Sequence, residues 1–90
     1  MPHPRFSGEE IARTGEEIYD KRLRALVEIP ANIGKMISID IETGDYEIDH
    51  DTLVAARRVQ SRHPEAALYG KRIGYNAAYA LGGSLTRTGS

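Results

Sequence analysis

The chain has 90 residues, no cysteine and a formal net charge of −1. We therefore expect one small domain without disulfides or thiolate metal sites. No apolar run approaches the roughly 18 residues of a membrane span, and the first residues lack the apolar core of a secretory signal. We expect a cytoplasmic protein whose small core is supplemented by oligomerisation. Residues 1–51 carry 12 of the 13 acidic residues, whereas residues 52–90 carry one acid and six bases, so the halves are expected to neutralise each other within the fold or across a dimer.

The first predicted element is helical. Ser7 and Glu10 have the spacing of a capping box, and the same pattern repeats with Thr14. The sequence allows one helix over residues 8–28, or a turn followed by a helix from Gly15. A glycine inside a helix costs about 1 kcal/mol relative to alanine, which favours a break or a close approach there.

Residues 36–42 predict a half-buried strand, because apolar and polar residues alternate. The two faces carry Ile37, Ile39 and Ile41 on one side, and Ser38, Asp40 and Glu42 on the other. A tight turn at Thr43 and Gly44 leads into a second strand over residues 46–49. This hairpin places Ile41 opposite Tyr46, and Ile39 opposite Ile48.

A second helix is predicted to be capped by Asp49 or Asp51 and to run to about Arg62, where His63 and Pro64 stop it. Three further segments are predicted after it: a strand over residues 67–75, a short helix over residues 76–81 and a tail over residues 83–90. The domain is expected to span residues 7–82, after a flexible arm over residues 1–6.

These elements predict an α+β fold with an N-terminal helix followed by a strand–strand–helix–strand unit. A right-handed crossover makes the third strand parallel to the second. Placing it beside the first strand gives a sheet of order 2-1-3, with the isoleucine-rich strand in the middle. We expect the second helix to cover the isoleucine face, and the first helix to cover the opposite face or another subunit.

Three segments carry a family resemblance: Gly34 with Lys35, residues 39–49, and residues 72–75. Over residues 16–82 the chain resembles a group of small uncharacterised bacterial proteins, frequent in cyanobacteria, with an "IDIETGDYEID" hairpin and a final "RIG" strand. More distantly it is similar to small domains with a strand–strand–helix–strand plan. The resemblance implies an antitoxin-like or accessory role beside the product of an adjacent gene, and it implies no catalytic residue or cofactor.

Asp40 and Glu42 resemble the first motif of proofreading-type 3′–5′ exonucleases, in which Asp-x-Glu on a strand holds two Mg²⁺ ions. Two-metal chemistry needs further carboxylates from other elements, and Glu65 is the only acid after Asp51. We interpret the pair as a polar strand face beside a turn. The triplet around His50, flanked by Asp49 and Asp51, is interpreted as a helix cap.

The hairpin is unusually acidic. The expected register brings Asp40 opposite Glu47 and Glu42 opposite Asp45, and like charges in opposite positions destabilise a sheet. The candidates for compensation are Lys35, Lys71, Arg72, arginines of another subunit, or a divalent cation. We expect internal bases to compensate.

Five basic residues form a candidate contact surface for a partner or an anion: Arg57, Arg58, Arg62, Lys71 and Arg72. Nucleic-acid binding normally accompanies a net basic domain, and this chain has a net charge of −1. The alternative interpretation of these bases is a helix face exposed to solvent.

Three hypotheses follow. The first is a homodimeric protein–protein interaction module, antitoxin-like or an accessory subunit. The second is a nucleic-acid-binding regulator that uses the second helix. The third is a metal-dependent enzyme that uses the acidic hairpin. We favour the first, with no enzymatic activity and no cofactor.

Overall fold

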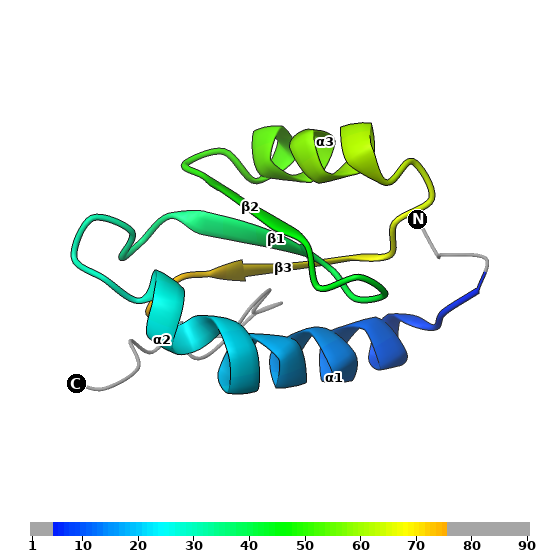
Figure 1. The fold of residues 1–90 in the computed structure, drawn as a ribbon, viewed down its shortest axis with the longest axis horizontal. Coiled ribbons are helices and arrows are strands. Elements are labelled where there is room, and N and C mark those ends of the chain that lie inside the picture. The colour runs from blue at the N-terminus through cyan, green and yellow to red at the C-terminus, as the bar shows by residue number, and fades with distance from the viewer. Residues whose placement is uncertain (1–4, 76–90) are drawn as a thin grey trace, which may run out of the picture.

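A three-stranded sheet lies between two helical layers (Figure 1). The computed structural model describes residues 5–75. The observed order is helix, strand, strand, helix, strand, which is the α+β architecture expected from the sequence. Within the described part of the chain, none of the helices combines the length and the apolar character that crossing a membrane requires. The helix predicted over residues 76–81 and the tail over residues 83–90 lie outside the described residues.

The chain begins with one long helix. The α-helix α1 (Gly8–Ile18) continues into a π-helical turn, η1 (Tyr19–Leu23), and a last α-helical turn, α2 (Arg24–Val27). The predicted capping box is confirmed, because the N–H of Glu10 donates to the Ser7 hydroxyl and the N–H of Ser7 donates to the Glu10 carboxylate. Of the two arrangements that the sequence allowed, the structure adopts the continuous helix.

The π-helical turn keeps one side of this helix aligned with the sheet. Its inward residues recur at every fourth position: Ile11, Gly15, Tyr19, Leu23 and Val27. An α-helix turns by about 100° per residue, so a spacing of four rotates such a stripe by about 40° at each step. A π-helix, with its i→i+5 bonds, has a wider turn that offsets this rotation. The N–H of Arg24 accordingly bonds to the carbonyl of Tyr19.

The sheet consists of β1 (Met36–Asp40), β2 (Tyr46–Asp49) and β3 (Leu68–Arg72), in the order β2-β1-β3. Both outer strands are antiparallel to β1, so β3 runs in the same direction as β2. The predicted order and directions are therefore confirmed, although the third strand is shorter than the predicted residues 67–75.

The predicted hairpin register is wrong by two residues. Ile39 lies opposite Tyr46, and Ile37 lies opposite Ile48. β1 ends before Ile41, and the two-residue turn is replaced by a longer loop.

The side chain of Asp40 explains the longer loop. Its carboxylate accepts hydrogen bonds from the N–H of Glu42 at 3.0 Å and from the hydroxyl of Thr43 at 2.8 Å. The N–H of Gly44 bonds back to the carbonyl of Asp40 at 2.8 Å, and Gly44 has a φ of +80° that suits glycine. These contacts begin the turn at the end of β1.

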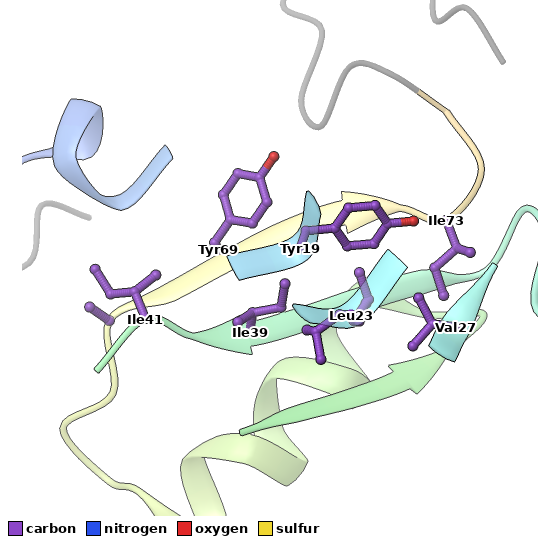
Figure 2. Packing of buried hydrophobic residues seen from close by; sticks show 9 residues of the cluster. Tyr19, Leu23, Val27, Ile39, Ile41, Tyr69 and Ile73 are labelled. Carbon is purple, nitrogen blue, oxygen red and sulfur yellow. The ribbon is translucent and has the colours of Figure 1, made fainter. Parts of the chain in front are cut away.

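The two helical layers cover faces opposite to those predicted. The isoleucine face of β1 packs against the long N-terminal helix, through Tyr19, Leu23 and Val27 (Figure 2). The second helix, α3 (Thr52–Arg62), lies over β1 and β2 on the other face (Figure 1). Its buried residues, Ala55 and Val59, are small.

This exchange of faces follows from side-chain size. The small residues of α3 suit the face of β1 that carries Ser38 and Asp40, whereas the larger residues of the long helix fill the space above the isoleucines. Because both faces are covered, β1 is buried along its whole length and is not half-buried as predicted.

Gly15 lies at a tight contact between α1 and β3. A Cβ at this position would lie closer than 3.0 Å to the side chain of Tyr69. The glycine therefore marks a close approach between helix and strand, which was one of the two expectations for it.

Candidate functional site

The charged face of β2 and the adjoining flank of α3 form a ladder of ion pairs. Arg62 donates through Nε to Asp45 and through Nη1 to Glu47, both at 2.8 Å. Arg58 lies 3.1 Å from Asp49. The two arginines are four residues apart on a helix, and Glu47 and Asp49 are two residues apart on a strand, so each pair shares one face of its element.

These contacts favour the ionised carboxylates. Arg62, with smaller contributions from His63 and the backbone of Tyr46, lowers the pKa of Asp45 to about 2 from an ordinary value of 3.8. The N–H of Asp51 and the charge of Arg58 lower the pKa of Asp49. The hydrogen bonds to Asp45 and Glu47 raise the pKa of Arg62. These shifts favour the charged forms of Asp45, Asp49 and Arg62.

Internal bases pair with the acidic hairpin, as expected, but they are arginines outside the predicted set, since Lys71 pairs with Glu16 and Arg72 donates to the carbonyl of Gly34. Besides the ladder, Arg5 pairs with Glu42. Arg22 of η1 lies against Gly44, within about 3.5 Å of where a Cβ would stand. The predicted opposition of Asp40 to Glu47 is wrong, since Ser38 occupies the position opposite Glu47.

His63 caps the C-terminus of α3 and lies between two carboxylates. Its Nε2 is 2.9 Å from Asp45, and its Nδ1 is 4.0 Å from Asp40. Asp40 is only 2% exposed, and the loop's hydrogen bonds satisfy its oxygens.

A shallow cleft of about 610 Å³ opens beside this histidine. Its walls come from the N-terminal arm, the hairpin loop and the segment after α3. The lining residues are Arg5, Asp40, Glu42, Thr43, Arg62, His63, Pro64, Glu65 and Ala66. Arg5 pairs with Glu42 across the cleft, whereas Arg62 and His63 are held by Asp45, which does not line it. These charged side chains of the cleft therefore already have partners within the protein.

Asp40 and Glu42 do not share a strand face, as the metal-binding motif that they resemble requires. β1 ends at Asp40, so Glu42 lies in the loop and pairs with Arg5 instead of sharing a strand face with Asp40. No group of three or more candidate ligands that could hold a metal ion occurs within residues 5–75. The triplet around His50 forms a helix start, in which Asp51 accepts from the N–H of Leu53 at 2.8 Å.

The five predicted contact residues do not gather on one surface. Arg58 and Arg62 belong to the ladder, and Arg57 is exposed on α3. Lys71 is fully buried against the N-terminal helix, 3.3 Å from Glu16. Arg72 donates to the carbonyl of Gly34 at 2.7 Å, and is therefore engaged elsewhere.

A polar network between the N-terminal helix and β3 was not anticipated. The hydroxyl of Tyr69 donates to Glu16, the ammonium of Lys71 lies 5.0 Å from the ring centre of Tyr19, and the hydroxyl of Tyr19 donates to Glu28 at 2.6 Å. Burial and the neighbouring carboxylate raise the pKa of Tyr19. Glu16 and Lys71 are 55 residues apart, so no local pattern signals their contact.

Comparison of the chain with protein-family models, curated proteins and solved structures finds no match.

Proposed function

We propose that this protein is a small protein–protein interaction module that acts as a homodimer, in an antitoxin-like or accessory role and without enzymatic activity. The observation that carries the proposal is the incomplete cover of the sheet at β2. On the side of the N-terminal helix, α1 lies over β3. Tyr46 and Ile48 of β2 face that side and are only half-buried.

The flank of the long helix that faces the hairpin loop adds apolar surface. Arg22 lies against the hairpin loop, and residues four positions away share its side of the helix. Those residues are Ile18, which is half-buried, and Leu26, which is 66% exposed. Ile29 follows directly and is 45% exposed. Exposed apolar side chains near one another along one helix support protein association more than isolated apolar residues do.

Charge and size support the same proposal. Two of the three arginines of α3 are held in the ladder, which leaves a weak basic surface for nucleic acid. A chain of 90 residues without disulfides also has a small core, and a subunit interface is one of the few means of adding buried apolar area to it.

Light scattering coupled to size exclusion tests the proposal over a series of protein concentrations. We expect a mass near twice that of the 10.0 kDa chain, and a melting temperature that rises with protein concentration, because association stabilises the folded subunits. A monomeric mass and a constant melting temperature at every concentration would contradict the proposal. The accessory role further predicts that the product of an adjacent gene co-purifies at a fixed ratio.

A further inference from the structure

β2 is an outer strand, and the hydrogen bonds of its inner edge define those of its outer edge. The N–H of Asp40 donates to the carbonyl of Asp45 at 2.8 Å, and such bonds recur at every second residue of an antiparallel pair. Tyr46 and Ile48 therefore direct their backbone groups away from β1. The N–H of Tyr46 is occupied by the Asp45 carboxylate at 2.9 Å. Ile48 is thus the residue of β2 whose outward N–H and C=O have no partner strand within residues 5–75.

The charges on β2 do not oppose pairing with another strand in the usual way. Charged side chains commonly protect sheet edges from association. Here Glu47 lies 2.8 Å from Arg62, and Asp49 lies 3.1 Å from Arg58, so each strand carboxylate already has a guanidinium partner. A second copy of β2 would bring the same balanced set of two carboxylates and two arginines.

The position of α3 also suits a second copy. α3 lies over β1 and β2, and neighbouring strands are about 4.8 Å apart. If β2 pairs with a second β2, the two α3 helices lie about 10 Å apart, which is close to the usual packing distance of helices. On the opposite side, the half-buried Tyr46 and Ile48 become continuous with those of the second copy.

We propose that the homodimer forms by antiparallel pairing of β2 with β2 of a second copy, which joins two three-stranded sheets into one sheet of six strands. Ile48 lies opposite the second copy's Ile48 at the two-fold axis and exchanges two backbone hydrogen bonds with it. Glu47 then lies opposite the second copy's Asp49, each with its own arginine beside it. This inference rests on the proposed function, since it identifies the partner and the surface of the same association.

Cysteine cross-linking tests this arrangement, because the native chain contains no cysteine. Hydrogen-bonded residues in opposite positions have Cα atoms about 5.5 Å apart, within the range that a disulfide spans. Ile48→Cys is therefore expected to form a covalent dimer under mild oxidation. The matched control is Leu53→Cys on α3, since Leu53 is 60% exposed and lies on the opposite side of this helix from the buried Ala55. Cross-linking of both variants at the same rate, or of neither, would overturn the arrangement.

A second pair of variants removes the backbone donor. Ile48→Pro lacks the outward N–H but is compatible with an edge strand, whereas Ile48→Thr loses similar packing and keeps the donor. We expect Ile48→Pro to be monomeric by light scattering and Ile48→Thr to remain dimeric, with circular dichroism confirming that both are folded. A folded, dimeric Ile48→Pro would overturn the arrangement, and if this variant does not fold, the cross-linking result decides. A wild-type dimer in which Ile48→Cys fails to cross-link leaves the proposed function standing, whereas a monomeric wild type removes both.

Discussion

Replacing Gly15 with alanine tests whether the helix and sheet are as close as the structure indicates. In an exposed helix the change would stabilise the protein by about 1 kcal/mol. Here the new Cβ would lie closer than 3.0 Å to the side chain of Tyr69, and overpacking of this kind costs about 1–3 kcal/mol. Tyr69 is 5% exposed and its hydroxyl donates to Glu16, so moving the ring weakens a hydrogen bond worth about 1 kcal/mol. We expect Gly15→Ala to lower the free energy of unfolding by about 2 kcal/mol.

The matched control is Gly8→Ala, at the first position of the same helix. No atom lies within 4 Å of a Cβ built there, so we expect a change between zero and a gain of about 1 kcal/mol. Urea unfolding followed by circular dichroism measures both variants. If Gly15→Ala is as stable as the wild type, or more stable, the contact between α1 and Tyr69 is not as described.

Three further changes probe the polar contacts, each measured by urea unfolding. Arg62 holds the pKa of Asp45 at about 2, below its ordinary value of 3.8, so the contribution of Asp45 to stability is complete above pH 3.8 and is lost as the pH falls towards 2. Asp45→Asn should lower the free energy of unfolding by about 1 kcal/mol at neutral pH, after allowance for solvent screening. It should also flatten the pH dependence of stability between these two pH values, and an unchanged slope would contradict the pairing. Lys71→Met should have a free energy of unfolding within about 1 kcal/mol of the wild type, whereas Glu16→Gln should lower it by roughly 1–3 kcal/mol because a buried ammonium loses its counter-charge. A larger loss for Lys71→Met than for Glu16→Gln would argue against the pairing of Glu16 with Lys71. Thr43→Val should cost about 1–2 kcal/mol, because a buried carboxylate oxygen of Asp40 loses its donor, and a neutral result would show that another group replaces the hydroxyl.

The order of the elements could be predicted from the sequence because each has a local signal. These signals depend on residues close together in the chain: the capping box at Ser7, the alternation that includes Ile37 and Ile39, and the cap at Asp51. The direction of the third strand could be predicted because a helical crossover makes it parallel to the second, and placing it beside the first strand gave the sheet order. The faces of the sheet could not be assigned in the same way, because which helix covers the isoleucines depends on comparing the side chains of both helices.

Among the polar contacts, too, one part could be predicted from the sequence and another could not. That internal bases neutralise the hairpin could be inferred from the charge distribution, but the choice of Arg58 and Arg62 over Lys71 depends on which face α3 covers. Once α3 lies on the face of Glu47 and Asp49, its basic flank meets these carboxylates directly. Lys71 lies under the other helix and takes a different partner.

Asp40 shows how one side chain can alter several sequence-based interpretations together. As a strand residue followed by Glu42 it resembled a metal ligand, and a two-residue turn after it gave a consistent apolar register. In the structure its buried carboxylate accepts hydrogen bonds from the loop, which ends β1 and moves the pairing by two residues. The same shift brings Glu47 opposite Ser38 rather than opposite another acid, and leaves Asp45 within reach of Arg62 and His63. The register that separates Glu47 from Asp40 is therefore also the one that forms the ion-pair ladder and balances the charge on the outer strand.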